Sequence, residues 1–248
     1  MKQLQILFYS LLLNLCLLQA QQSDVMAEYE MVLQFSGNVL YTGKLLFNSG
    51  RSLFLFRPAA TQDHYTEEDQ GNNKATMRIL DTTDAYISIN RSENILLEKK
   101  KSLYTKEVLL VKEEVPRQAW VLEEEQKIIG RFSCKKAVAF FRGRRYIAWY
   151  CPDLPYSFGP WKLNGLPGLI VETRDEEGEV SFSLKQIVSP FHAPLMPQHQ
   201  DPLKIIAYPD YRKKIQQEEL AFQQRILSRF SREMNATVSV KRDDIERE

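Results

Sequence analysis

The stretch RFSCKKAVAFFRGRRYIAWYC, residues 131–151, predicts an antiparallel β-hairpin. Apolar and polar residues alternate on both sides of Arg142-Gly143, with the period of two that is expected of a strand with one buried face. A two-residue turn at Arg142 and Gly143 would place Cys134 directly opposite Cys151. Arginine is unfavourable at the positive φ of such a turn. A three-residue loop with a bulge at Gly143, which slips the pairing by one residue, is therefore the alternative.

The same alternation recurs along most of the chain. Short strands are expected at residues 29–35, 43–47, 51–56, 77–80, 85–89, 94–97, 107–111, 120–122, 169–173 and 179–188. Residues 58–75 are polar and rich in turn-forming residues, and they predict an exposed loop. Strands at this spacing, with few helical patterns between them, favour an antiparallel meander over βαβ units. We expect a mainly β fold in which the meander forms a curled sheet or half-barrel.

The stretch GPWKLNGLPGLIVE, residues 159–172, is rich in glycine and proline and ends in an apolar run. A phosphate-binding glycine loop would be followed by a helix, whereas the run after Gly168 predicts a strand. Pro167 and Gly168 suit the two central positions of a type II turn, where the glycine takes a positive φ. Two further corners are expected upstream, and the residues expected to shape the backbone here are Gly159, Pro160, Gly165, Pro167 and Gly168.

A proline-rich segment, residues 189–202, separates the predicted sheet from a predicted helix. It contains His192 and His199, which are candidates for a metal site together with a carboxylate, although their spacing of seven matches no usual zinc pattern. After this segment, Asp210 is expected to cap an amphipathic helix over residues 211–234. We expect that helix to pack on one face of the sheet.

The first residues of the chain predict a secretory signal peptide. Lys2 precedes the uncharged run ILFYSLLLNLCLL, residues 6–18, and the small residue Ala20 follows it. Because a membrane span needs about 20 apolar residues, a retained anchor is the less favoured alternative. The expected division is residues 1–20 as signal peptide, residues 21–209 as the antiparallel β domain with the glycine-rich stretch, and residues 210–248 as the amphipathic helix with a polar tail.

The charge of the chain argues against nucleic acid as a partner. The whole sequence carries 33 basic and 32 acidic residues, and removal of Lys2 with the signal peptide leaves a formally neutral chain. A neutral chain with interspersed signs lacks the basic surface that nucleic acid or anionic lipid would require. No later stretch is long and apolar enough to predict a membrane span.

Cys134 and Cys151 are candidates for a disulfide, because Cys16 leaves with the signal peptide and two cysteines remain in an oxidising compartment. In the two-residue register their Cα atoms would be about 4.5 Å apart. That distance is at the short end of the range that a disulfide spans. Closing a loop of this size would contribute roughly 3 kcal/mol. Two buried free thiols are the alternative.

Residues 128–172 resemble the GLPGLI family, whose name is the sequence of residues 165–170. The resemblance rests on the Cys-Lys-Lys-Ala run at residues 134–137, the Arg-Gly-Arg turn at residues 142–144 and the Ala-Trp-Tyr triplet at residues 148–150. It implies a secreted or envelope protein of Bacteroidetes-type bacteria without an established function. It brings no catalytic or ligand-binding residue.

No sequence pattern predicts a catalytic centre or a cofactor, since neither a GxSxG nor an HExxH motif occurs. The first hypothesis is a non-enzymatic binding or accessory protein of the cell envelope, located in the periplasm, at the outer membrane or outside the cell. Its partner would be an outer-membrane protein, a peptide or an apolar ligand in the concave face of the sheet. The alternatives are a periplasmic hydrolase assisted by a metal at His192 and His199, and a structural component of the envelope.

Overall fold

The structure is a computed structural model of the chain. It describes residues 24–35, 38–59, 74–79, 85–102, 104–195, 203–228, 237–242 and 245–247.

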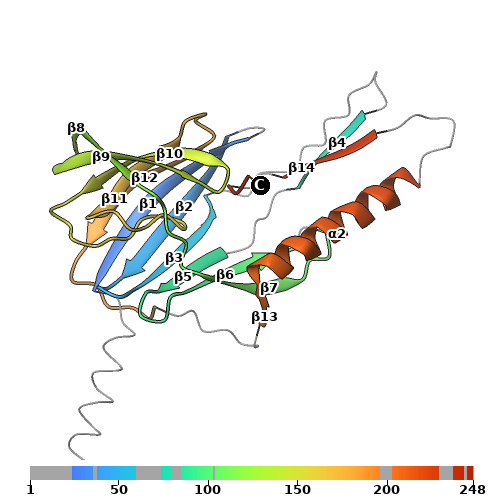
Figure 1. Cartoon of the computed structure of the whole chain (residues 1–248), viewed down its shortest axis with the longest axis horizontal. Coiled ribbons are helices and arrows are strands. Elements are labelled where there is room, and N and C mark those ends of the chain that lie inside the picture. Colours follow the sequence, from blue (N-terminus) through green and yellow to red (C-terminus); the bar gives the residue numbers. More distant parts are fainter. Residues whose placement is uncertain are drawn as a thin grey trace, which may run out of the picture.

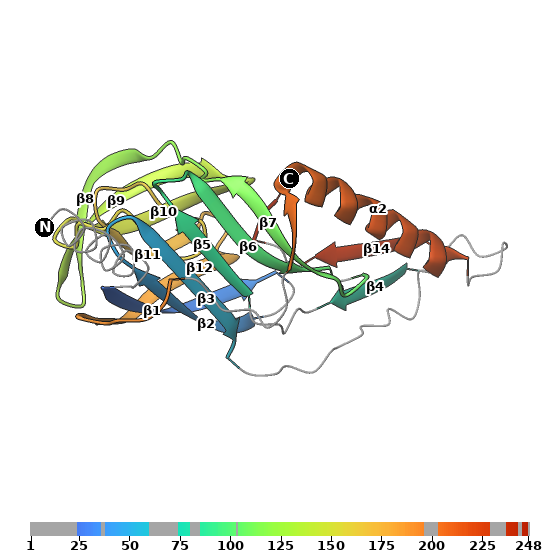
Figure 2. The same cartoon turned by 90° about the horizontal axis from the view of Figure 1, so that it is seen from below.

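Twelve strands form one curled sheet that does not close into a barrel (Figures 1 and 2). Its first half is a meander of β1 (Val25–Gln34), β2 (Asn38–Phe47), β3 (Arg51–Pro58), β5 (Ala85–Asn90), β6 (Ile95–Lys101) and β7 (Val108–Glu114). Its second half is a meander of β8 (Val121–Ile129), β9 (Phe132–Phe141), β10 (Arg144–Cys151), β11 (Leu169–Asp175) and β12 (Val180–Val188). The two halves meet where β1 pairs with β12. The expected fold class, a mainly antiparallel curled sheet, is confirmed.

The hairpin of β9 and β10 has the two-residue turn that the sequence predicts. Phe141 pairs with Arg144, and the register continues unbroken to Lys135 and Tyr150. Arg142 adopts a φ of 49° in this turn, despite the cost of a positive φ for a residue with a side chain. The alternative with a bulge is therefore wrong.

Two predictions at the edges of the sheet need correction. The strand expected at residues 77–80 is β4 (Lys74–Ile79), which pairs in parallel with β14 (Thr237–Arg242) outside the main sheet, so that β3 pairs directly with β5. A further strand, β13 (Lys204–Ala207), adds to β7 in parallel and was not predicted. Most of the loop expected at residues 58–75 lies outside the described residues.

The helix α2 (Tyr208–Leu227) begins earlier than predicted. Its N-cap is Ala207, and Asp210 lies in the first turn instead of capping the helix. Only one of its described side chains, that of Ile215, is buried. The predicted packing of this helix on the sheet is confirmed, since it contacts β7 and β13. It also runs beside β14 (Figure 2). No described helix is long and apolar enough to cross a membrane.

The concave side of the sheet is filled by the chain itself. Residues 152–168, here called the plug, run between β10 and β11 and bury Phe158, Trp161 and Leu166 in the main hydrophobic core. The hydroxyl of Tyr29, on β1, donates a hydrogen bond of 2.6 Å to the carbonyl of Ile170, which ties the start of β11 to the middle of the sheet.

Candidate functional site

The end of the plug has a tighter turn than the sequence predicts. The amide of Gly168 donates to the carbonyl of Leu166 at 2.8 Å, which is the pattern of a three-residue turn centred on Pro167. The predicted type II turn is wrong because the φ of Gly168, 155°, is far from the value of about 80° that this turn type requires. The amide of Leu169 donates to the carbonyl of Leu154 at 2.9 Å. The φ of Gly168 is still positive.

The upstream corners of the plug follow the predicted residues. Gly165 has a φ of 94°, and the amide of Leu163 donates to the carbonyl of Pro160 at 3.2 Å. A Cβ atom at Gly159 would lie 2.7 Å from the side chain of Ile170, so the glycine allows the plug to pack against β11. These turns position the residues between them in the interior.

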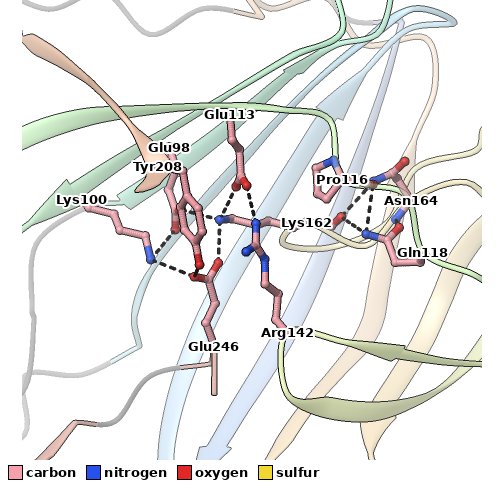
Figure 3. A network of polar contacts seen from close by, with 10 residues as sticks. All are labelled: Glu98, Lys100, Glu113, Pro116, Gln118, Arg142, Lys162, Asn164, Tyr208 and Glu246. Atoms are coloured by element: carbon pink, nitrogen blue, oxygen red, sulfur yellow. Dashed lines mark hydrogen bonds and ion pairs between the residues drawn. The ribbon is translucent and has the colours of Figure 1, made fainter. Parts of the chain in front are cut away.

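Lys162, from the plug, is the centre of a buried ion cluster (Figure 3). Its side chain is 0% exposed, and its Nζ lies 2.8 Å from Glu98 Oε2, 2.7 Å from Glu113 Oε1 and 2.6 Å from Glu246 Oε1. Glu98 comes from β6 and Glu113 from β7. Glu246 belongs to residues 245–247, here called the tail segment. This segment is distant from both strands in the sequence, although Glu246 contacts Lys162 in the structure.

Further charged and aromatic groups surround these four residues. Lys100 Nζ lies 3.4 Å from Glu98 and 3.8 Å from Glu246, and Arg142 forms an ion pair with Glu113. The hydroxyl of Tyr208 donates to Glu246 Oε2 at 3.0 Å, and the guanidinium of Arg142 lies 4.2 Å from the centre of its ring. The Lys162 cluster is defined here by its three bases and three acids, which are Lys100, Arg142, Lys162, Glu98, Glu113 and Glu246.

The backbone beside Lys162 is held by side chains of the β7–β8 connection (Figure 3). The Gln118 amide donates to the carbonyl of Lys162 at 3.2 Å and accepts from the amide of Asn164 at 3.1 Å. The Trp120 indole donates to the carbonyl of Asn164 at 2.8 Å. These bonds fix the backbone on the carboxyl side of Lys162, from which its side chain reaches three carboxylates.

A second buried cation, Arg144, lies at the start of β10. Its side chain is 1% exposed and forms ion pairs with Asp175 at 2.5 Å and Glu179 at 2.9 Å. Its Nε also donates to the carbonyl of Ile245 at 2.7 Å. Arg247 forms an ion pair with Glu179. The tail segment therefore connects the two buried ion clusters.

The two central groups of the Lys162 cluster are held in their charged forms. Burial by itself would lower the pKa of Lys162, but the carboxylates of Glu98 and Glu246 raise it above its ordinary value. Burial by itself would raise the pKa of Glu246, but Lys100 and Lys162 bring it far below its ordinary value. Neither group is poised to exchange a proton near neutral pH, which a general acid or base requires. The arrangement is suited to holding the plug and the tail segment together.

The lowered pKa of Glu246 predicts a dependence of stability on pH. Its contribution is present above the pKa of an unfolded glutamate, about 4.3, and is lost as the pH falls, because the unfolded chain then binds a proton that the folded chain does not. We expect the melting temperature to fall between pH 7 and pH 3 by at least about 3 °C more in the wild type than in Glu246→Gln. Calorimetry at both pH values measures this difference. Glu124→Gln, at an exposed position on β8, should behave as the wild type does, and equal falls in all three proteins would contradict the prediction.

Cys134 and Cys151 lie side by side with Val171 in a small buried cluster on the outer face of the sheet. Both are free thiols in the structure. Burial, with a smaller effect of Cys151, raises the pKa of Cys134 to about 11, so its thiol is protonated at neutral pH and is a poor nucleophile. The disulfide stays a prediction.

Only one of the two candidate metal ligands lies within the described residues. His192 is exposed, and His199 lies outside the described residues. Among the residues that are described, no group of three or more His, Cys, Asp and Glu side chains is arranged to hold a metal ion. A metal site involving these histidines stays a prediction.

The Lys162 cluster was not predicted from the sequence, although two strands carried a signal for it. Alternation places Glu98 on the same face of β6 as buried Leu96, and Glu113 on the same face of β7 as buried Val111. Two carboxylates on the apolar faces of neighbouring strands indicate that a buried base pairs with them. Lys162 has no such periodicity, because it lies in an irregular segment.

Comparison with known proteins shows similarity at two levels. Residues 142–172, from the β9–β10 turn through the plug to β11, match the model of a family described as "Protein of unknown function (Porph_ging)". No curated protein matches the chain. Two structures of PNGF-II, in the P21 and C2 space groups, match 80% of the chain with TM-scores of 0.51 and 0.50 and sequence identities of 15% and 14%. The match covers 34% and 33% of those chains, so this chain spans about a third of their length. At such identities the likeness shows the fold alone.

Proposed function

We propose that the chain is an exported protein of the cell envelope that binds a partner protein without catalysing a reaction. The observation that carries this proposal is an apolar patch beside a free sheet edge. Val121 on β8 is 64% exposed and Phe140 on β9 is 72% exposed. Val121 pairs with Val138, so Val121, Val138 and Phe140 share the outer face of the sheet. Exposed apolar side chains of this size favour an interaction surface.

The edge itself supports the same function. β8 is the last strand in the order of the described sheet, so one side of its backbone is available for pairing. Its pairing with β9 is irregular between Leu122 and Gln126, and the Nζ of Lys136 lies 2.8 Å from Glu123 and 2.7 Å from Glu125 in that irregular part. Nonspecific pairing of β8 with strands of other chains would require a flat, uncharged edge. These charges therefore restrict pairing at β8 to partners whose charges match. The edge and the patch together fit a protein partner.

The chemistry of the interior also supports binding over catalysis. The buried bases and acids around Lys162 and Arg144 are ion-paired with one another, and the thiol of Cys134 is protonated. No described feature favours the alternative of a metal-assisted hydrolase. Export rests on the signal peptide that residues 1–20 predict.

Site-specific photo-crosslinking in the native cells tests this proposal. A photoreactive residue at position 140 should give a discrete cross-linked product, and the same residue at position 185, where Lys185 is half-exposed and pairs with Glu30, should not. Val121→Asp should reduce the yield at position 140 at least about fivefold, because a charge in the patch opposes apolar contact. The product should fractionate with the cell envelope, and its chain should lack residues 1–20. Equal products at both positions, or none at position 140, would contradict the proposal.

A further inference from the structure

The three residues of the tail segment meet three different chemical environments. Ile245 is buried in the main hydrophobic core. Glu246 is buried and contacts the cations Lys162 and Lys100. Arg247 forms ion pairs with the carboxylates of Glu177 and Glu179. An apolar, an acidic and a basic residue are thus each surrounded by groups of complementary character.

Each charged residue of the tail segment lies beside groups whose net charge is opposite to its own. The other members of the Lys162 cluster, which surround Glu246, are three bases and two acids: Lys100, Arg142, Lys162, Glu98 and Glu113. The ion-pair partners of Arg247 are two acids, Glu177 and Glu179, and Glu179 also pairs with Arg144. The first set therefore favours an anion and the second a cation. The two sets meet at the β9–β10 turn, so they favour the order acid then base along an extended segment.

The backbone of the tail segment is also recognised. Arg144 Nε donates to the carbonyl of Ile245 at 2.7 Å, and the amide of Arg247 donates to the carbonyl of Arg142 at 3.0 Å. At Gly143, a Cβ atom would lie 1.8 Å from the carbonyl oxygen of Arg247, so this glycine provides the room for the segment to lie against the turn. Main-chain hydrogen bonds combined with side-chain subsites are how proteins bind extended peptides.

We propose that this arrangement is a peptide-binding site, that the tail segment occupies it in the isolated chain, and that a partner segment of the same chemistry, apolar then acidic then basic, displaces it. We call it the tail site; it consists of Lys100, Arg142, Gly143, Arg144, Lys162, Glu177 and Glu179. This inference rests on the proposed function, since it specifies a ligand class for a binding protein. It is independent of the apolar patch on β8 and β9.

Competition by the tail segment determines the design of the test. A segment tethered in the same chain acts at an effective concentration on the order of millimolar, so the wild type should bind an added peptide weakly. Glu246→Arg puts a cation against Lys162 and should release the tail segment while leaving the tail site intact. Glu124→Arg makes the same charge change at an exposed position of β8 and is the matched control.

The experiment measures fluorescence anisotropy of a labelled peptide with the sequence of residues 241–248, KRDDIERE, added to each full-length protein. We expect Glu246→Arg to bind it with one-to-one stoichiometry and at least tenfold more tightly than the wild type or Glu124→Arg. A peptide with residues 246 and 247 exchanged should bind Glu246→Arg at least tenfold more weakly. Equal affinity for all three proteins, equal affinity for both peptides, or no binding to a cooperatively melting Glu246→Arg would overturn the proposal.

A milder variant keeps the test decisive if Glu246→Arg fails to fold. Glu246→Gln then replaces it, with an expected gain of at least threefold over the wild type. If that variant also fails to melt cooperatively, peptide is added to the wild type at concentrations up to about ten times the effective concentration of the tethered segment. Absence of saturable binding under that condition overturns the tail site. Cross-linking at position 140 would be unaffected by such a result, so failure of the tail site and failure of the proposed function are distinguishable.

Discussion

Lys162→Met is expected to lower the free energy of unfolding by about 3 to 5 kcal/mol, which is the range for removing one partner from a buried ion pair. Methionine fills most of the volume of the lysine side chain. It leaves the carboxylates of Glu98, Glu113 and Glu246, which lie within 2.8 Å of the lysine ammonium, with two bases in place of three. Chemical denaturation monitored by circular dichroism measures the change.

Two further variants distinguish the stability cost of leaving buried carboxylates unpaired from the cost of losing a lysine side chain. Lys185→Met removes a lysine whose Nζ lies 2.9 Å from Glu30 at a half-exposed position, and it should cost less than about 1 kcal/mol. Adding Glu246→Gln to Lys162→Met should recover part of the lost stability, because one uncompensated carboxylate is removed. Equal costs for the two single lysine variants would show that the Lys162 cluster contributes no more than a surface pair.

Gly168→Ala is expected to cost about 3 kcal/mol, from a steric and a conformational contribution. A Cβ atom at Gly168 would lie 2.2 Å from the carbonyl oxygen of Cys151 and 3.0 Å from the nitrogen of Pro152. Both contacts are with backbone atoms, which no side-chain rotation can relieve. The φ of 155° adds a cost for any residue with a side chain. Thermal unfolding of the purified variant gives the measurement.

Gly178→Ala is the matched control for that variant. Gly178 also has a positive φ, of 75°, but apart from its chain neighbours no described residue has an atom within 4 Å of the position that its Cβ would take. It should therefore show the conformational contribution alone, about 1 kcal/mol. If the two glycine variants lost the same stability, the close approach between the end of the plug and Cys151 would have no energetic effect.

Local patterns were sufficient to predict most of the sheet. Period-two alternation and turn residues predicted the strands of both meanders and the two-residue turn at Arg142 and Gly143, because these depend on residues close together in the chain. The pairing of β1 with β12, the parallel addition of β13 to β7 and the separation of β4 from the main sheet depend on contacts between distant segments. Alternation within a strand carries no information about which distant strand will pair with it.

The candidate site was less predictable than the fold for the same physical reason. Gly159, Gly165 and Gly168 of the plug have the close contacts or positive φ values that favour glycine. The burial of Lys162, by contrast, follows from where the plug lies inside the sheet. Glu246 belongs to a short polar segment whose composition predicts exposure. Its burial requires Lys162 and Lys100, which lie far away in the sequence.

The central position of the β1–β12 pairing has a consequence for the order of assembly. Residues 25–34 emerge early in synthesis, yet their partner on one side, residues 180–188, comes after the whole first meander and most of the second. Hairpins within each meander involve short loops and form early, whereas this ladder closes a loop of about 150 residues and bears the entropy cost of that closure. The two halves of the sheet therefore cannot pair until β12 has left the ribosome. Until then, β1 presents an unpaired edge to which a chaperone, or a second nascent chain, has access.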